Sequence, residues 1–371
     1  MTRNPPPGPA ASREASPDGA RARTTAEPRP DGARRRRGGV RRGLRALAGP
    51  GPWRRGPVLT AAALVLGLLL LLHAEIPNGW TGNLGSLVET FLPWFGVFVP
   101  VLLAGALWRR SASAVVALLL PVVVWLNLFG GLLLDKSRPA GDLTVAEQNV
   151  DAGNPDPART ARDLAASGAD LLALVELTPQ STGAYEKGLA GAYPYRAVQG
   201  TVGLWSKLPL SDAEQLDIMD FGPLAATKPL AEKTAGNRAL RITVTTPRGP
   251  LTVYVAHLGS VRVNPRAGFW TTSRDIGAQI LGKAVAADPS RRVVLLGDLN
   301  GTTDDRAFAP LTSQLQSAQD TAGNGFGFTW PAAFPVAGID QILVRGVQPD
   351  SSRVLGATGS DHLPVAAAIS W

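Results

Sequence analysis

The sequence predicts an α/β (α+β) globular domain that is preceded by three transmembrane helices. Three long apolar runs follow one another between residues 57 and 134 and contain few charged residues. From about residue 139 onward, short apolar runs of strand length alternate with helical patterns and Gly/Pro turns, which is typical of a mixed α/β domain. We find no internal repeat.

Residues 1–56 form a tail rich in Arg and Pro. They hold 14 Arg and 4 acidic residues, a balance of +10, so the remaining residues sum to −2 although the whole chain carries +8. Almost no large apolar residue occurs before Val40, and such a composition cannot offset the entropy lost on ordering. We therefore expect a disordered cytoplasmic tail. Its basic run 34–47 leaves both nucleic acid and anionic lipid open as partners.

The three apolar runs cover residues 57–76, 87–107 and 113–134, approximately, and each is near the length that crosses a bilayer. One alternative is a buried helical hairpin of a soluble protein, which three successive runs disfavour. A signal peptide is disfavoured as well, because the first run starts too late and two more follow. The runs therefore predict a membrane segment over residues 57–135.

The cations around these runs predict their orientation, since Lys and Arg near membrane spans stay preferentially in the cytoplasm. The Arg-rich tail precedes the first run, Arg109 and Arg110 separate the second run from the third, and the loop 73–89 has neither Lys nor Arg. We expect a multi-pass protein of the cell membrane, with a cytoplasmic N-terminus and residues 139–371 outside. The absence of Cys fits this location.

Within residues 139–371, apolar runs predict most of a β-rich core. The predicted strands are 142–150, 171–177, 202–206, 239–246, 251–258, 292–300, 338–344 and 364–371. Asp156 and Pro157 are expected to open one helix, and a second helix is expected over 270–287.

Polar side chains recur at the ends of these apolar strands. They are Asn149, Asp151, Glu176, His257, Asp298, Asn300, Asp340, Asp361 and His362. Carboxylates beside buried strands are costly unless they are paired, hydrated or bound to a cation. A turn or a cap explains any one of these residues alone. Their joint occurrence predicts one shared site.

Seven short motifs in this segment resemble those of the endonuclease/exonuclease/phosphatase superfamily, which includes deoxyribonuclease I, abasic-site endonucleases, inositol polyphosphate phosphatases and neutral sphingomyelinases. The motifs are NVD (149–151), VELT (175–178), LWSKLPL (204–210), VAHL (255–258), GDLN (297–300), GIDQILV (338–344) and SDHLPV (360–365). The resemblance spans about residues 143–369. It implies a four-layer α/β sandwich of two mixed β-sheets flanked by helices, with residues 139–371 as the catalytic domain.

Two positions depart from the family pattern. Val175 stands where many relatives have Gln, and Gln341 stands where Tyr or His is frequent. Neither change removes a catalytic group, but both weaken an assignment to the abasic-site nuclease branch.

The resemblance also implies a divalent metal, Mg²⁺ or alternatively Mn²⁺, because both prefer hard oxygen ligands. Glu176 is the expected principal metal ligand. Asn149 is expected to help hold the metal or the phosphate, Asp151 to assist the metal cluster, and Asp361 to complete the metal or water network. Asp298 is similar to the family residue that polarises the attacking water.

The remaining roles concern the phosphate. Asn300 is expected to position the water or the phosphate, and His362 to donate to a phosphate oxygen, with Asp340 as its orienting partner. His257 matches the family's second histidine, which contacts the phosphate or acts as an acid toward the leaving group. Arg238 resembles a phosphate-binding residue, with a surface ion pair as the alternative.

These residues predict a membrane-anchored, divalent-metal-dependent phosphoesterase of the nuclease or of the phospholipid and small-molecule phosphodiesterase type. Residues 139–371 hold 19 Lys and Arg against 22 acidic residues, which disfavours long duplex DNA but leaves nucleic acid open as a substrate. The Gly-rich aromatic loop 323–330 is expected either to flank the site or to pack as ordinary core. The alternative function is a catalytically silent, membrane-anchored binding module that kept the fold.

Overall fold

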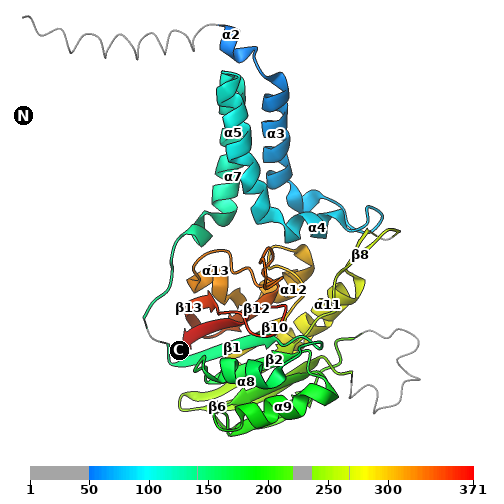
Figure 1. Cartoon of the computed structure of the whole chain (residues 1–371), viewed down its shortest axis with the longest axis vertical. Helices are drawn as coiled ribbons and strands as arrows, with labels where there is room; N and C mark the ends of the chain where they lie inside the picture. Colours follow the sequence, from blue (N-terminus) through cyan, green and yellow to red (C-terminus); the bar gives the residue numbers. More distant parts are fainter. Residues whose placement is uncertain (1–49, 140, 220–235, 267) are drawn as a thin grey trace, which may run out of the picture. The chain divides into compact units, whose positions relative to one another are not determined.

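The computed structural model describes residues 50–139, 141–219, 236–266 and 268–371. The predicted disordered tail lies outside these residues except for its last few positions. The chain divides into two units, Met1–Pro52 and Trp53–Trp371. The second unit contains both the apolar helices and the α/β domain (Figure 1).

The N-terminal part of the described chain is helical. Its elements are α2 (Pro50–Trp53), α3 (Pro57–Leu71), η1 (His73–Glu75), α4 (Leu84–Thr90), η2 (Leu92–Val97), α5 (Phe98–Trp108), α6 (Ala112–Ala117), α7 (Leu119–Phe129) and η3 (Gly130–Leu133). Together, α6, α7 and η3 form a helix of 22 residues, Ala112–Leu133, with a mean hydropathy of 2.3 in its most apolar window. By length and composition, it is the one described helix able to cross a bilayer unaided.

The second apolar run is bent. Helix α4 and the helical stretch Leu92–Trp108 meet at 68°. This run is a second candidate span only if the two bent helices are counted together as one membrane segment. Pro93 lies at the start of η2 and provides a reason for the break, because proline has no N–H for a helical hydrogen bond. Helix α3 has only 15 residues. Three membrane crossings therefore remain a prediction.

The rest of the second unit is the α/β domain. Its strands are β1 (Leu143–Asn149), β2 (Leu171–Val175), β3 (Tyr195–Gln199), β4 (Val202–Ser206), β5 (Leu210–Gln215), β6 (Ala239–Thr246), β7 (Gly249–Ala256), β8 (Arg262–Asn264), β9 (Gly268–Trp270), β10 (Val293–Asp298), β11 (Gln316–Ser317), β12 (Asp340–Arg345), β13 (Gln348–Val354) and β14 (Val365–Ser370). Its helices are α8 (Pro157–Ala165), α9 (Pro179–Leu189), α11 (Thr272–Ala287), η5 (Arg306–Phe308), α12 (Ala309–Thr312) and α13 (Ala318–Ala322).

Two six-stranded sheets organise this domain, and both are mixed. The first has the order β13-β14-β1-β2-β4-β3 and the second the order β11-β12-β10-β7-β6-β5. Strands β1 and β2 are parallel, as are β7 and β10, whereas the other named pairs within the two sheets are antiparallel. Residues at the carboxyl ends of β1 and β2, and of β7 and β10, can therefore contribute to one site.

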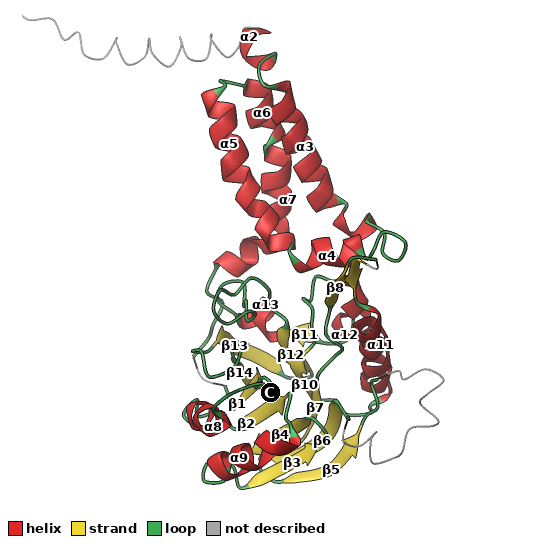
Figure 2. Cartoon of the chain, turned by 45° about the vertical axis from the view of Figure 1, so that its right-hand side comes forward, coloured by secondary structure: helices red, strands yellow, loops and turns green. Residues whose placement is uncertain are grey.

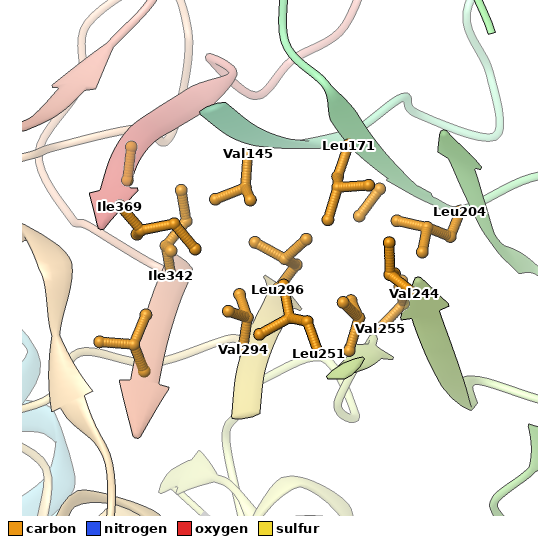
Figure 3. Packing of buried hydrophobic residues seen from close by; sticks show 14 of the residues in the cluster. Val145, Leu171, Leu204, Val244, Leu251, Val255, Val294, Leu296, Ile342 and Ile369 are labelled. Atoms are coloured by element: carbon orange, nitrogen blue, oxygen red, sulfur yellow. The ribbon is translucent and has the colours of Figure 1, made fainter. Parts of the chain in front are cut away.

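The main core lies between the two sheets. Alternate residues of the strands point into it, and Val145, Leu171, Leu296 and Ile342 are among the side chains that meet there (Figure 3). A second cluster includes residues of α11 and α12, and a third includes residues of α8 and α9. Figure 2 shows these helices beside the sheets. Helix, sheet, sheet and helix layers follow one another, which confirms the predicted four-layer sandwich.

The aromatic loop 323–330 packs against the apolar helices. Phe328 stacks on Trp94 with ring centroids 5.6 Å apart, and Phe326 lies 6.2 Å from Trp125. Of the two expectations for this loop, packing is therefore the one observed for its phenylalanines. Trp330 at its end lies nearer to the site, with its ring centroid 6.5 Å from that of His362.

Candidate active site

Asp298 lies at the centre of the candidate site, at the carboxyl end of β10. A Cβ added to the preceding Gly297 would lie 1.8 Å from Ala256 O, so only glycine lets β10 approach β7 this closely. Asp298 is also the direct partner of Asp340 in the antiparallel pairing of β10 with β12. Directly opposite residues point to the same face of a sheet, so two buried carboxylates lie side by side.

Hydrogen bonds from two asparagines hold the Asp298 carboxylate. Oδ1 accepts from the Asn300 backbone N–H at 2.8 Å, and Oδ2 accepts from Asn149 Nδ2 at 3.0 Å and from Asn300 Nδ2 at 3.2 Å. Burial and the charge of Asp340 nevertheless raise the pKa of Asp298 to about 7. This carboxyl group can accept a proton near neutral pH.

His362 pairs with Asp340 in the same buried region. Its Nδ1–H donates to the two Asp340 oxygens at 2.9 and 3.1 Å, while Nε2 lies 4.0 Å from Asp298 Oδ2. Burial alone would lower the pKa of His362, but the hydrogen bond and charge of Asp340 outweigh it and raise that pKa to about 9. The ring is therefore an imidazolium at neutral pH, with Nε2–H directed toward the site.

His257 lies between a guanidinium and two carboxylates. Arg238 Nη2 is 2.6 Å from both ring nitrogens, whereas His257 Nε2 is 3.5 Å from Glu176 Oε1 and 3.6 Å from Asp298 Oδ2. Burial, and after it the charges of Arg238 and His362, hold the pKa of His257 well below its ordinary value. This imidazole is neutral at neutral pH.

Strands β1 and β2 deliver the other side of the site. Their parallel register places Asn149 beside Val175, so the turns that follow the two strands are adjacent. Glu176 Oε2 accepts a hydrogen bond from the Ala152 backbone N–H at 3.2 Å, which ties one turn to the other. Asp151, Glu176 and Asn300 have φ angles of 58°, 64° and 52°, a left-handed backbone that costs an ordinary residue about 1–2 kcal/mol.

The structure links eight of the ten predicted site residues through the contacts given above. They are Asn149, Glu176, Arg238, His257, Asp298, Asn300, Asp340 and His362. Asp151 lies next to this cluster, but its Oδ1 accepts from the Gly153 backbone N–H at 2.7 Å within its own turn. Asp361 is exposed, and its Oδ2 accepts from Trp330 Nε1 at 3.4 Å.

One buried group in this region was not predicted from the sequence. Glu147 on β1 is fully buried, and neither carboxyl oxygen has a hydrogen-bond partner. Burial, followed by the charges of Asp340 and Asp298, raises the pKa of Glu147 well above its ordinary value. Strand alternation could have indicated it, because Val145, Glu147 and Asn149 share one face of β1.

The donor set fits a divalent cation. Asp298, Asp340 and His362 bring polar atoms within 4.8 Å of one another. Because His362 is charged and bound to Asp340, the carboxylate oxygens are the atoms available to a metal. Glu147 with its orphaned oxygens and Glu176 add carboxyl groups to the same region. A divalent cation would stabilise the charged form of these carboxylates, and oxygen ligands suit a hard divalent metal.

Solved structures resemble the chain at low sequence identity. The structure of D. rerio TDP2 complexed with single strand DNA product is 19% identical and has a TM-score of 0.48, covering 61% of this chain and 98% of that one. An endonuclease/exonuclease/phosphatase from Bacteroides vulgatus is 17% identical, with a TM-score of 0.49 and coverage of 61% and 98%. The mannosyl-6-phosphatase of Bacteroides thetaiotaomicron is 15% identical, with a TM-score of 0.47 and coverage of 62% and 100%.

No curated protein matches the chain. A family model does, under the description Endonuclease/Exonuclease/phosphatase family, and it matches residues 146–362. This match takes in more than half of the chain and every residue of the linked cluster. The two mixed sheets and their covering helices agree with the fold that the motifs implied. The chain therefore belongs to the endonuclease/exonuclease/phosphatase family.

Proposed function

We propose that this protein is a membrane-anchored, divalent-metal-dependent phosphoesterase. The observation that carries the proposal is the convergence of Glu176, His257, Asp298 and His362, from strand ends of both sheets, on one buried cluster. A binding module that had lost activity would not need this complete set of acidic, amide and imidazole groups. The family to which the chain belongs unites nucleases and phosphatases, both of which act on phosphate esters.

Asp298 and His362 supply complementary proton chemistry. Asp298, with its pKa of about 7, accepts a proton from the attacking water, and Asn300 orients the Asp298 carboxylate through its backbone and side-chain N–H groups. His362 donates from Nε2 to a phosphate oxygen, since Asp340 holds its Nδ1. A charged donor in a buried site stabilises the negative charge that develops in the transition state.

His257 takes a different role because it is neutral. We infer that it contacts the phosphate or the attacking water as a neutral hydrogen-bonding group, rather than acting as the acid toward the leaving group. Arg238, which lies against the ring, is placed to attract the phosphate anion.

Glu176 and Asn149 are the proposed ligands of Mg²⁺, or of Mn²⁺, beside Asp298. When bound, the ion would neutralise charge on the phosphoryl oxygens. Asp151 and Asp361 would reach it through water, because their carboxylates are directed to Gly153 and Trp330.

Several features support membrane anchoring. Besides the 22-residue apolar helix, the helical part exposes large apolar side chains, which include Val101, Leu107, Leu119 and Val123 at about 60% exposure each. A soluble protein rarely exposes so much contiguous apolar surface. We propose the three predicted crossings, at 57–76, within 87–107 and at 113–134, with an extracytoplasmic domain at 139–371. The second crossing is limited to the part of 87–107 that follows Trp94, because Glu89 and Trp94 contact the α/β domain. An active periplasmic-type reporter fused after Trp371, with an inactive cytoplasmic one, would support this orientation, and the opposite pattern would overturn it.

The substrate is proposed to be a phosphodiester or a phosphomonoester. The excess of acidic over basic residues in 139–371 favours a small or lipid-linked phosphodiester over long duplex DNA, and nucleic acid remains a second candidate. The anchoring favours the same choice, because it keeps the site close to lipids.

The deciding experiment uses the full chain in lipid nanodiscs with a bis-aryl phosphate, a dispersed phospholipid and plasmid DNA as substrates. We expect hydrolysis that EDTA abolishes and that Mg²⁺ or Mn²⁺ restores. Asp298→Asn, which keeps the side-chain shape, serves as the control for contaminating enzymes. If the folded chain hydrolyses no phosphoester in a metal-dependent way, the silent binding module is the better description.

A further inference from the structure

Helix α4 lies against loops of the α/β domain, although it precedes the family-matched residues (Figure 2). Asn83, which precedes α4, donates from Nδ2 to Phe269 O at 2.9 Å and to Thr271 Oγ1 at 3.2 Å. Beyond α4, Trp94 Nε1 donates to Val336 O at 2.8 Å. The segment is therefore anchored to the domain on both sides of the helix.

Glu89 of α4 forms an ion pair with Arg306, the first residue of η5, whose side chain is partly exposed. Glu89 Oε1 lies 2.7 Å from Arg306 Nη2 and accepts from Nε at 2.9 Å, while Oε2 accepts from the Arg306 backbone N–H at 3.2 Å. The Glu89 side chain is only 1% exposed. The Glu89 carboxylate thus holds both the side chain and the backbone of Arg306, the last residue of the 300–306 loop. Hydrogen bonds between charged groups are stronger than those between neutral groups.

A second path runs from α4 to Asn300 itself. Ser86 Oγ donates to Asp305 Oδ1 at 3.2 Å, and Asp305 Oδ2 accepts from Arg274 Nη2 at 2.6 Å. Arg274 is completely buried, and its Nη1 lies 3.4 Å from Asn300 O. The chain of contacts ends on the residue whose two N–H groups hold the Asp298 carboxylate.

We propose that α4 is a positioning element of the active site. Through Glu89 and Ser86 it fixes the 300–306 loop and with it the left-handed turn at Asn300, which places the Asn300 side chain. The working unit then includes residues 84–90 and not only 139–371. This inference rests on the proposed phosphoesterase function and adds to it a dependence on residues outside the family-matched region.

Glu89→Gln in the full chain tests the proposal, because Gln keeps the shape of the side chain but removes its charge. We expect kcat to fall about 10-fold, since small misplacements of catalytic groups are costly, and KM to change less than about 2-fold. Asp288→Asn is the matched control. Asp288 also pairs with an arginine, Arg241, at 2.7 Å. It follows the C-terminal end of α11, whereas Arg274, which contacts Asn300, lies near the N-terminal end. Asp288→Asn should lower thermal stability and leave kcat unchanged.

A double variant separates positioning from general destabilisation. If Glu89 acts by placing the Asn300 side chain, then Glu89→Gln should lower kcat by less than about 2-fold in an Asn300→Ala background, because interacting residues give non-additive effects. The proposal is overturned if Glu89→Gln lowers kcat as much in the Asn300→Ala background as in the parent chain. It is also overturned if Glu89→Gln in the parent chain lowers kcat no more than Asp288→Asn does.

Hydrogen exchange supplies a readout that needs no activity. We expect the amides of residues 299–308 to exchange faster in Glu89→Gln than in the parent chain and to be unaffected in Asp288→Asn. If the parent chain hydrolyses no substrate, the proposed function fails while this comparison still decides the role of α4. Unchanged exchange at 299–308 counts against the inference in either case.

Discussion

His257 and His362 lie within one cluster but in opposite electrostatic surroundings. His362 has a carboxylate, Asp340, at 2.9 Å and is charged at neutral pH, whereas His257 has a guanidinium, Arg238, at 2.6 Å and is neutral. Both rings are almost completely buried, so burial alone does not distinguish them. The difference shows that the nearest ionised partner decides which histidine can donate a charged hydrogen bond.

Replacing each histidine by glutamine gives the largest expected contrast. His362→Gln should lower kcat at least about 100-fold, or about 2.7 kcal/mol, because a neutral amide replaces a charged donor. His257→Gln should lower kcat only about 10-fold, because one neutral hydrogen-bonding group replaces another. Steady-state kinetics of the full chain measure both values. Equal losses would remove the distinction between the two rings.

The pH dependence of the parent chain and of Asp340→Asn sharpens the same contrast. With the pKa of His362 at about 9, the protonated form is the active one, so kcat should fall as pH rises through about 9. In Asp340→Asn the decline should begin well below this pH. The variant loses the hydrogen bond and charge that chiefly oppose burial and keeps only the smaller contributions of Asp298 and Asp361. For stability the sign is the same: the pair's contribution is complete below about pH 6.5 and is lost as pH rises through about 9.

Replacing Arg238 tests whether its charge helps to keep His257 neutral. Arg238→Met should raise the pKa of His257, although burial will still hold it below the ordinary value, and should raise KM about 10-fold through the lost phosphate contact. NMR titration of the ring and steady-state kinetics measure the two effects. A pKa of His257 that does not move would mean that Arg238 has no part in keeping the ring neutral.

The smallest effect is expected at Asp361. Its side chain is exposed and directed to Trp330, so Asp361→Asn should change kcat less than about 3-fold. Metal titration of this variant should give nearly the parent affinity. A loss comparable to that of Glu176→Ala would instead place Asp361 among the metal ligands.

The strands that carry the site were predictable from the sequence, because each combines an apolar run with a polar end. Asn149 and Asp298 end β1 and β10, and Glu176 follows β2. All three strands are buried except at Thr144, and the structure brings the three polar residues together as expected. The four edge strands of the two sheets, β3, β5, β11 and β13, were missed. β3 and β5 have no buried residue, β11 has only two residues and β13 is polar, so none shows the apolar pattern on which the predictions depended.

Other features depend on contacts between distant residues, which local sequence does not encode. The resemblance predicted the pairing of His362 with Asp340, and the structure shows it. The neutral state of His257 was not predicted, because it follows from burial and from Arg238, which only the folded sheet places beside the ring. The bend before Pro93 was also missed, since Leu87–Leu107 is apolar throughout except for Glu89 and Thr90. That single acidic residue was the available signal that part of the run contacts protein.

The left-handed backbone at Glu176 lowers the stability of the protein, while the Glu176 carboxylate is needed for the proposed activity. Glycine adopts this conformation freely, whereas glutamate adopts it at a cost of about 1–2 kcal/mol. A laboratory selection for heat resistance alone would therefore enrich glycine at position 176 and discard the carboxylate. Efforts to make a hardier form of this protein have to select for hydrolysis in the same step.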